Sequence, residues 1–410
     1  MNVKSMQPAI NIGLVGHVDH GKTTLTERLS GKWTDTHSEE MKRGITIKLG
    51  YADTVFYKCP KCNKYTVKEK CYDCSEEATE PVRKVSFVDA PGHESLMATM
   101  LAGTTVMDGA VLLVAANENC PQPQTREHLM ALEISGIKNV IIAQNKIDLV
   151  DNERAIKNYN QIKEFLSDTA YKDAPIIPLS AQHGANIHYL IDAIEKHIPT
   201  PTKDKSKDPI FLVARSFDIN KPGSTPDKIT GGILGGALVQ GSLRVGQRLE
   251  IKPGRVLEEQ NQIVTKPIHT KIISITSGGN SVDEITPGGS IGIMTSLDPS
   301  IVKSDNLVGN LVGLPDKLPP VWTTLKLEIN LLKRVVGSQQ DLEVQPLRLG
   351  EVLMLNVNSA ATVGQVIDLG KNIATMKLRL PICAEINSRV SISRKVGTRF
   401  RLIGFGMIKQ

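Results

Sequence analysis

The sequence lacks long apolar runs, and none of its apolar stretches reaches the roughly 20 residues that a helix needs to cross a bilayer. It also lacks a low-complexity segment and a clear internal repeat, which excludes architectures built from repeated units. Residues 1–8 do not combine a basic segment with an apolar core, so we expect no signal peptide. These absences predict a cytoplasmic protein that is not attached to a membrane.

Aromatic residues and cysteines are scarce. Aromatic residues make up 4% of the 410 residues and there are six cysteines, whereas hydrophobic residues reach 40% and charged residues 22%. This composition is ordinary for a globular protein with sizeable cores, and the length predicts two to four domains. The formal net charge of +6 is compatible with an RNA partner but does not indicate one.

The most informative stretch is residues 16–23, which read Gly-His-Val-Asp-His-Gly-Lys-Thr and fit the pattern of a phosphate-binding loop. An apolar run precedes the loop and a helical pattern follows it, as the motif requires. Backbone N–H groups of such a loop surround a polyphosphate, Lys22 would reach the outer phosphates, and the Thr23 hydroxyl would ligate Mg²⁺. We therefore expect nucleotide binding by Asp19, His20, Gly21, Lys22, Thr23 and Thr24.

Up to about residue 200, short apolar runs alternate with helical patterns. The runs 109–116 and 140–143 are typical of strands buried on both faces of a sheet. One expected helix has an apolar face formed by Ile156, Tyr159, Ile162, Phe165 and Leu166. We therefore predict an α/β domain over residues 1–203, a P-loop domain with a doubly wound, mostly parallel sheet. Its ligand should lie at the carboxyl ends of the strands.

The residue pattern changes after a linker that contains Pro199, Pro201 and the charged run 203–208. Short β patterns then recur, separated by glycine pairs such as 231–232, and long helical periodicity is absent. A second block of β patterns begins near residue 322. We predict two β-barrel domains, over residues 208–320 and 321–410.

A second motif, Asp89-Ala90-Pro91-Gly92-His93, directly follows an apolar run. An aspartate that leaves a strand beside a phosphate loop can hold Mg²⁺ through water. The Gly92 N–H can donate to a terminal phosphate, because glycine allows the backbone to come close. Such a contact exists only with a triphosphate, so it can sense hydrolysis.

Two further motifs point to guanine. Asn145, Lys146 and Asp148 follow one strand, and the Asp148 carboxylate can accept hydrogen bonds from N1–H and the amino group of guanine. Adenine would leave that buried carboxylate unpaired, which discriminates strongly. Ser180-Ala181-Gln182 follows the next strand and offers a backbone N–H to guanine O6. Each motif is weak alone, but four of them in this order exclude a chance glycine-rich turn.

Taken together, these motifs resemble the translational GTPases of the elongation factor Tu type, and residues 43–47 match the first switch of that family. The resemblance implies that Thr46 closes over Mg²⁺ and that His93 orients the attacking water behind an apolar gate of Val18 and Ile45. Gln182 departs from the leucine or lysine common after Ser-Ala, which a backbone contact tolerates. Asp19 either faces solvent or holds a second Mg²⁺ together with the Gly44 carbonyl.

Four cysteines form two Cys-x-x-Cys pairs within an insertion over residues 56–80. Cys59, Cys62, Cys71 and Cys74 predict a structural Zn²⁺ site, because four thiolates leave no open coordination position. Two redox pairs, or a knuckle that has lost its metal, are the alternatives. Cys120 and Cys383 have no partner motif and are expected to be buried thiols.

The insertion lies between the two switch motifs, where elongation factor Tu has none, and it is similar to the gamma subunits of initiation factor 2. That resemblance extends over essentially all residues, and the short N-terminus favours the archaeal form. It implies GTP, GDP, Mg²⁺ and Zn²⁺ as ligands, and slow GTP hydrolysis without a partner. It further implies a heterotrimer with alpha and beta subunits that delivers methionylated initiator tRNA to the small ribosomal subunit.

Two other functions stay open from the sequence. One is an elongation-type or selenocysteine-specific tRNA carrier, against which the cysteine insertion argues. The other is a regulatory GTPase subunit of a metabolic complex, which would need neither zinc nor an aminoacyl end. Few aromatic residues are available for base stacking, so we expect RNA contacts through the backbone and acceptor end. Arg394, Lys395, Arg399 and Arg401 either serve phosphates or form a solvated strand face.

Overall fold

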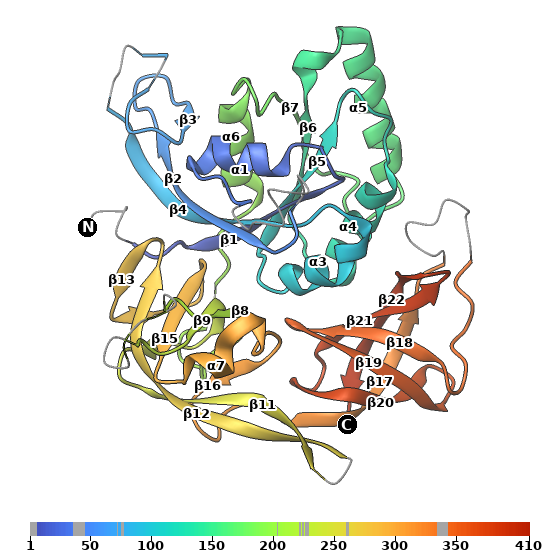
Figure 1. The fold of residues 1–410 in the computed structure, drawn as a ribbon. Helices are drawn as coiled ribbons and strands as arrows, with labels where there is room; N and C mark the ends of the chain where they lie inside the picture. The colour runs from blue at the N-terminus through green and yellow to red at the C-terminus, as the bar shows by residue number, and fades with distance from the viewer. Residues whose placement is uncertain are drawn as a thin grey trace. The chain divides into compact units, whose positions relative to one another are not determined.

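The computed structural model describes residues 6–35, 46–71, 73–74, 78–202, 204–220, 223, 225, 229–259, 262–333 and 343–410. The chain divides into two compact units. The first lies within Met1–Pro201, and the second comprises the described residues of Thr202–Val335 and Gln340–Gln410 (Figure 1). Within these described ranges, no helix is both long and apolar enough to cross a membrane.

The first unit is built on a seven-stranded sheet in the order β3-β2-β4-β1-β5-β6-β7. Its strands are β1 (Ile10–Gly16), β2 (Gly50–Lys58), β3 (Tyr65–Thr66), β4 (Glu80–Asp89), β5 (Gly109–Ala115), β6 (Val140–Asn145) and β7 (Ile176–Pro178). Its helices are α1 (Lys22–Ser30), α3 (Met97–Thr104), α4 (Pro123–Ile134), α5 (Asn152–Leu166) and α6 (Ile187–His197), with the 3-10 turns η2 (Glu94–Leu96) and η3 (Ile147–Leu149).

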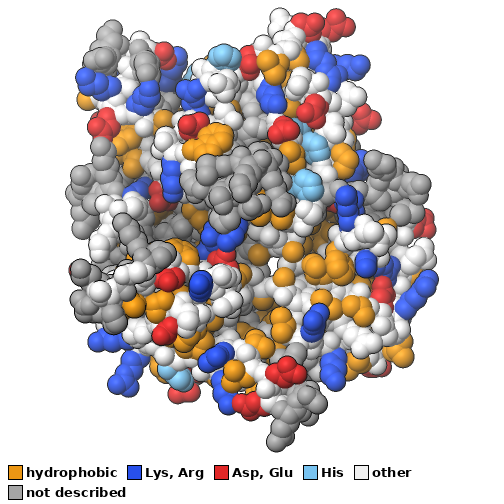
Figure 2. Space-filling model, in the orientation of Figure 1, with side chains coloured by type: hydrophobic (Ala, Val, Ile, Leu, Met, Phe, Trp, Pro, Cys, Tyr) orange, Lys and Arg blue, Asp and Glu red, His pale blue; other side chains and the backbone are white. Residues whose placement is uncertain are grey.

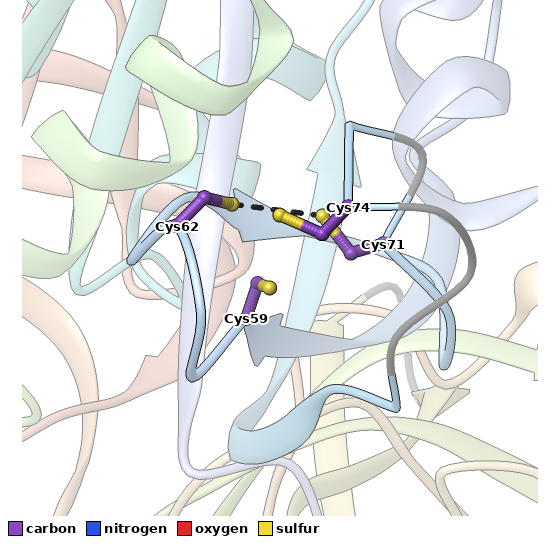
Figure 3. Close-up of side chains that lie close together, drawn as sticks. All are labelled: Cys59, Cys62, Cys71 and Cys74. Carbon is purple, nitrogen blue, oxygen red and sulfur yellow. Dashed lines mark hydrogen bonds between the residues drawn. The ribbon is translucent and has the colours of Figure 1, made fainter.

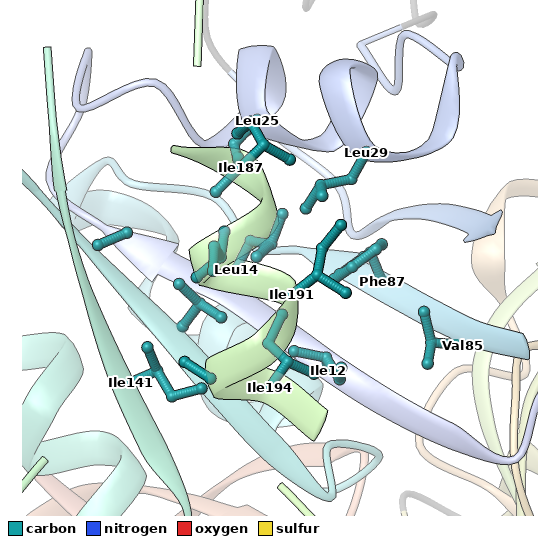
Figure 4. Close-up of a cluster of buried hydrophobic side chains, with 14 of the residues drawn as sticks. Ile12, Leu14, Leu25, Leu29, Val85, Phe87, Ile141, Ile187, Ile191 and Ile194 are labelled. Carbon is teal, nitrogen blue, oxygen red and sulfur yellow. The ribbon is translucent and has the colours of Figure 1, made fainter. Parts of the chain in front are cut away.

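Parallel pairing runs through the middle of this sheet. β1 lies between β4 and β5, β6 follows β5, and β7 follows β6, all in parallel register, whereas β2 and β3 pair antiparallel at one edge. Every residue of β1, β5 and β6 is buried, as expected for strands covered by helices on both faces. Figure 4 shows Ile187 and Ile191 of α6 in one buried cluster with Leu25 and Leu29 of α1.

The predicted apolar face of α5 is wrong in part. Ile156 is 61% exposed and Tyr159 is 36% exposed, and the buried positions are Asn158, Ile162 and Leu166. Asn158 can be buried because its amide is fully engaged. It donates to the carbonyls of Ala115 and Glu118 and accepts from the Gln144 side chain at 2.9 Å. A buried amide with these partners costs little, and it shifts the buried face by one position.

The second unit begins with a closed barrel of antiparallel strands in the order β11-β16-β8-β9-β15-β12, which the pairing of β11 with β12 completes. The strands are β8 (Ile210–Phe217), β9 (Ile233–Gln240), β11 (Arg248–Glu259), β12 (Gln262–Ser277), β15 (Ile291–Thr295) and β16 (Leu311–Gly313). Outside the ring lie β10 (Leu243–Arg244), β13 (Asn280–Val282), β14 (Glu284–Ile285), α7 (Pro299–Val302) and η5 (Lys303–Asp305).

A second closed barrel follows, in the order β17-β20-β19-β18-β21-β22. Its strands are β17 (Val321–Leu331), β18 (Val352–Val357), β19 (Ala360–Leu369), β20 (Ile373–Cys383), β21 (Arg389–Val396) and β22 (Arg399–Lys409). Each barrel encloses its own apolar core, because the residues that alternate inward along the strands are leucine, isoleucine and valine. The predicted fold class, an α/β domain with a mostly parallel sheet followed by two β-barrels, is confirmed.

Candidate nucleotide-binding site

The loop between β1 and α1 contains backbone conformations that favour glycine. Gly16, Asp19 and Gly21 have positive φ angles of 143°, 60° and 92°. A Cβ at Gly16 would lie 2.5 Å from the Leu113 carbonyl oxygen, so the first glycine of the motif also permits a close approach to β5. In turns with positive φ angles, successive backbone N–H groups can converge on an anion.

Buried histidines tie the loop to the neighbouring elements. His128 of α4 accepts the Gly16 N–H with its Nδ1 at 2.9 Å, and His20 donates from its Nδ1 to the Leu113 carbonyl at 2.9 Å. Burial lowers the pKa of His20 to about 4 and that of His128 to about 3, so both rings are neutral near pH 7. The hydrogen bonds that these two histidines make to hold the loop are therefore formed by uncharged rings.

Lys22 is held by the loop that it follows. Its ammonium group donates to the carbonyls of Gly16 at 3.0 Å and His17 at 2.7 Å, and burial lowers the Lys22 pKa to about 8. Gly92 packs against it, because an added Cβ there would lie 2.5 Å from Lys22 Nζ. The structure thus brings Lys22 and Gly92 together, as a phosphate site for both residues requires.

Hydroxyl and carboxylate groups converge next to the loop. The Thr23 hydroxyl donates to Asp89 Oδ2 at 2.9 Å and lies 3.3 Å from the Thr46 hydroxyl, which donates to Asp35 Oδ1 at 2.8 Å. Asp89 Oδ1 is buried and has no hydrogen-bond partner among the described residues. Burial raises the pKa of Asp89 to about 6. Two carboxylates and two hydroxyls, with one unused buried carboxylate oxygen, form a donor set that suits Mg²⁺.

Asn145 connects the phosphate loop to the second base motif. Its amide donates to the His20 carbonyl at 2.9 Å and accepts from the Ala181 N–H at 2.9 Å. Asp148, two residues after Lys146, keeps its side chain 24% exposed, and His183 Nε2 lies 3.6 Å from its Oδ2. The two base motifs thus lie side by side, with the Asp148 carboxylate accessible to a base.

Other predicted residues lie around this site with less defined roles. His93 is partly exposed, and its Nδ1 lies 2.8 Å from the Ser95 hydroxyl within the same turn. Val18 is partly buried, and Asp19 is exposed, so its side chain faces solvent in this structure. Gly44 and Ile45 lie outside the described residues, so the apolar gate and the second magnesium site remain predictions.

The four clustered cysteines lie between β2 and β4 in the chain and come together in space (Figure 3). Their sulfur atoms all lie within 4.8 Å of one another, and Cys62 Sγ lies 3.6 Å from Cys71 Sγ. Sulfurs around a tetrahedral Zn²⁺ lie about 3.8 Å apart, given Zn–S bonds of about 2.3 Å. Backbone hydrogen bonds, chiefly from Cys62, lower the pKa of Cys59 to about 7. The cluster is compatible with zinc.

Several residues at the site escaped the sequence analysis. Thr34 donates to Asp89 Oδ2 at 2.7 Å, Asp35 binds Thr46, and His128 binds Gly16 from 112 residues away. Arg28 of α1 contacts the backbone of the Ser180-Ala181-Gln182 segment. None of these lies in a motif that could have identified it, although Asp35 lies in the run that leads into the first switch.

Two family models match the chain. The elongation factor Tu GTP binding domain matches residues 7–200, and the C-terminal domain of initiation factor eIF2 gamma matches residues 323–408. Translation initiation factor 2 subunit gamma of Pyrococcus abyssi is 58% identical over 407 residues, which are 99% of both chains. The protein of the same description from Methanocaldococcus jannaschii is 56% identical over 406 residues, covering 99% of this chain and 98% of that one.

Among solved structures, a bacterial selenocysteine-specific elongation factor EF-Sec matches 98% of this chain and 58% of its own, with a TM-score of 0.75 and 24% identity. Elongation factor SelB from Methanococcus maripaludis, in complex with a GTP analogue, matches 98% of this chain and 79% of its own, with a TM-score of 0.72 and 21% identity. At these identities the likeness establishes the shared fold and nothing further.

Proposed function

Because this chain belongs to the family of translation initiation factor 2 gamma subunits, we propose that it binds methionylated initiator tRNA in its GTP state and delivers it to the small ribosomal subunit. GTP hydrolysis then releases the factor. In this scheme residues 1–203 are the GTP-binding domain, and residues 208–320 and 321–410 are two β-barrel domains. The protein acts in the cytoplasm, together with alpha and beta subunits.

One observation carries the part of this proposal that assigns control to the nucleotide. The Thr46 hydroxyl, which belongs to the predicted first switch, lies 3.3 Å from the Thr23 hydroxyl of the phosphate loop. Thr23 in turn donates to Asp89 at the end of β4, three residues before Gly92. Three segments that would respond to the terminal phosphate therefore meet at one hydroxyl. A ligand that binds there can hold the switch segments in one arrangement, and its hydrolysis can release them.

The metal groups have separate roles in the proposal. Thr23 and Thr46 would ligate Mg²⁺ directly, and Asp89 would hold it through water, with Asp35 close to the same hydroxyls. Bound there, Mg²⁺ neutralises phosphate charge during phosphoryl transfer. Asp19 and the Gly44 carbonyl are candidates for a second Mg²⁺. The four clustered cysteines would hold a structural Zn²⁺ that closes the insertion between the switches.

For hydrolysis, we assign His93 to orienting the attacking water. Its Nδ1 is engaged by the Ser95 hydroxyl and by the Ser95 backbone N–H, so Nε2 is the ring nitrogen that would orient the water. Unassisted GTPases turn over at roughly 10⁻⁴ to 10⁻² s⁻¹, and partners add up to about 10⁵-fold. Slow intrinsic hydrolysis suits a carrier, because the carrier must retain its cargo until the ribosome is reached.

The face drawn in Figure 2 agrees with tRNA contacts that do not depend on one basic patch. On the face drawn in Figure 2, Lys and Arg side chains are interspersed with Asp and Glu. Arg394, a candidate phosphate contact, is already engaged by Glu351 at 2.5 and 3.1 Å and by the carbonyl of Gln345. Arg394 is therefore assigned to holding β21 in its barrel rather than to RNA.

The experiment that tests the function compares the binding of two kinds of aminoacylated tRNA. The GTP-loaded chain, alone and with alpha and beta subunits, is titrated with methionylated initiator tRNA and with an aminoacylated elongator tRNA. The proposal expects selective binding of the initiator. Equal binding of both tRNAs would favour an elongation-type carrier, and binding of neither in the presence of the subunits would favour a regulatory GTPase of a different complex.

A further inference from the structure

Arg28 joins the far end of α1 to the segment that would read guanine O6. It lies in the last turn of α1, whose N-terminus follows the phosphate loop. Its Nε donates to the Ala181 carbonyl at 2.9 Å, and its Nη2 donates to the Gln182 carbonyl. A planar guanidinium group can hold two carbonyls in this way, whereas an ammonium group offers only a point charge.

The backbone N–H groups around Ala181 show which peptide unit is left for a ligand. Ser180 N–H donates to the Ala185 carbonyl, Ala181 N–H to the Asn145 side chain, and His183 N–H to the Ser180 hydroxyl. Gln182 N–H donates to no acceptor within the described part of the chain. By elimination, the N–H available to a base is that of Gln182, not that of Ala181.

Gln182 N–H and the Ala181 carbonyl belong to the same peptide unit. A trans peptide is planar, and its N–H points opposite to its C=O, so fixing one group fixes the direction of the other. Arg28 binds this carbonyl and the next one along the chain. A cation bound to the carbonyl also polarises the peptide, which strengthens the N–H as a donor.

We propose that Arg28 is a positioning residue for guanine recognition, which orients and polarises the Ala181–Gln182 peptide so that its N–H meets O6 of the base. This inference rests on the proposed function, because it assumes that the site binds guanine nucleotides. It also couples two parts of the nucleotide site: the start of α1 holds the phosphates, and the end of the same helix sets the donor that reads the base.

Three diphosphates test this role without hydrolysis. GDP offers O6, IDP keeps O6 but lacks the 2-amino group, and 6-thio-GDP replaces O6 with sulfur, a weaker acceptor. Their dissociation constants are measured for the wild type, Arg28→Ala and Arg28→Lys. All three ligands carry the same diphosphate, so any effect of removing a positive charge cancels when affinity ratios are compared. The matched control is Glu27→Ala, because Glu27 is an exposed residue next to Arg28 in the same helix.

Arg28→Ala is expected to weaken the binding of GDP and of IDP by the same factor, about 5- to 10-fold, since one hydrogen bond is worth about 1 kcal/mol. Its affinity for 6-thio-GDP should fall less than about 2-fold, so the preference for GDP over 6-thio-GDP narrows. The affinities of Arg28→Lys should lie between those of the wild type and Arg28→Ala, and the affinities of Glu27→Ala should match those of the wild type. Thermal unfolding confirms that the variants are folded, and an Arg28→Gln variant replaces any that is not.

Equal weakening of all three ligands would overturn the inference, because it would indicate a general structural effect. Unchanged affinities would also overturn it. The wild type is also titrated with ADP, and a failure to prefer GDP over ADP would instead refute guanine recognition itself, and with it the proposed function. The two failures are therefore distinguishable in one set of titrations.

Discussion

His128 Nδ1 accepts a hydrogen bond from the Gly16 N–H at 2.9 Å, which anchors the first glycine of the phosphate loop to α4. Since Nδ1 is the acceptor, the ring must be neutral with its proton on Nε2. Burial, reinforced by the charge of Lys22 and by His17 and His20, lowers the His128 pKa from 6.5 to about 3. The loop therefore depends on an uncharged ring at a position that sequence patterns do not reveal.

This relationship predicts a pH dependence of stability. Between pH 3 and 6.5 the unfolded chain protonates His128 and the folded chain does not, so stability falls as the pH is lowered through this window. Near pH 5 the cost is about 2 kcal/mol from this group alone. The side-chain oxygen of asparagine in His128→Asn can still accept from the Gly16 N–H. Between neutral pH and pH 5, the thermal midpoint of this variant should fall less than that of the wild type. His17 and His20 titrate in both proteins, so an equal fall in both would contradict the assignment.

Replacing His93 should separate binding from hydrolysis. We expect His93→Ala to bind GTP with unchanged affinity but to lose about 100-fold or more of partner-stimulated turnover, because a water-positioning group acts only during the reaction. Single-turnover phosphate release with the ribosomal complex measures this. Ser95→Ala, which removes only the hydroxyl beside His93 Nδ1, is the matched control and should retain most activity. Stimulated turnover of His93→Ala at the wild-type rate would remove His93 from the mechanism.

The base specificity should follow Asp148. Asp148→Asn replaces an acceptor by a side-chain amide, so GDP should bind about 100-fold more weakly, because its N1–H and amino donors lose a charged acceptor. Xanthosine diphosphate, which carries a carbonyl in place of the 2-amino group, should bind the variant more tightly than the wild type. Asp151→Asn is a suitable control, because Asp151 only caps α5 and asparagine caps equally well. An unaltered order of GDP and xanthosine diphosphate would reject the role.

The cysteine cluster should hold metal. Elemental analysis of the purified chain should find about one zinc, bound by Cys59, Cys62, Cys71 and Cys74. Cys62→Ser should release most of the zinc and lower the thermal midpoint of the first unit. Cys120→Ser, which changes a buried thiol outside the cluster, should keep the full zinc content. A metal-free, fully folded protein with four titratable thiols in the cluster would exclude the site.

Much of the fold could be predicted because its signals are local. Continuous apolar runs identify β1, β5 and β6, and alternating patterns identify most barrel strands. β9 is hard to predict because Gly235 and Gly236 interrupt its pattern. The glycine at 236 is needed for packing, since a Cβ there would lie 1.8 Å from the Leu212 carbonyl oxygen. Glycine in a strand weakens the pattern where a neighbouring backbone comes close.

The candidate site could be predicted only where residue type and spacing carry the chemistry. Lys22, Asp89 and Asp148 lie in motifs that end strands, and the structure brings them to one edge of the sheet. Thr34, His128 and Arg28 could not be predicted, because their partners are distant in sequence and their contacts are with backbone or with single oxygen atoms. Asn158 was missed for a related reason, since hydrogen bonds allow an amide to occupy a core position.

The nucleotide state is expected to control retention of the cargo. The most direct test is the dissociation constant of methionylated initiator tRNA, measured for the empty, GDP-loaded and GTP-loaded chain at one magnesium concentration. We predict binding at least about 10-fold tighter to the GTP form, since coupling energies between sites are typically 1–3 kcal/mol. Equal affinity in all three states would contradict the account.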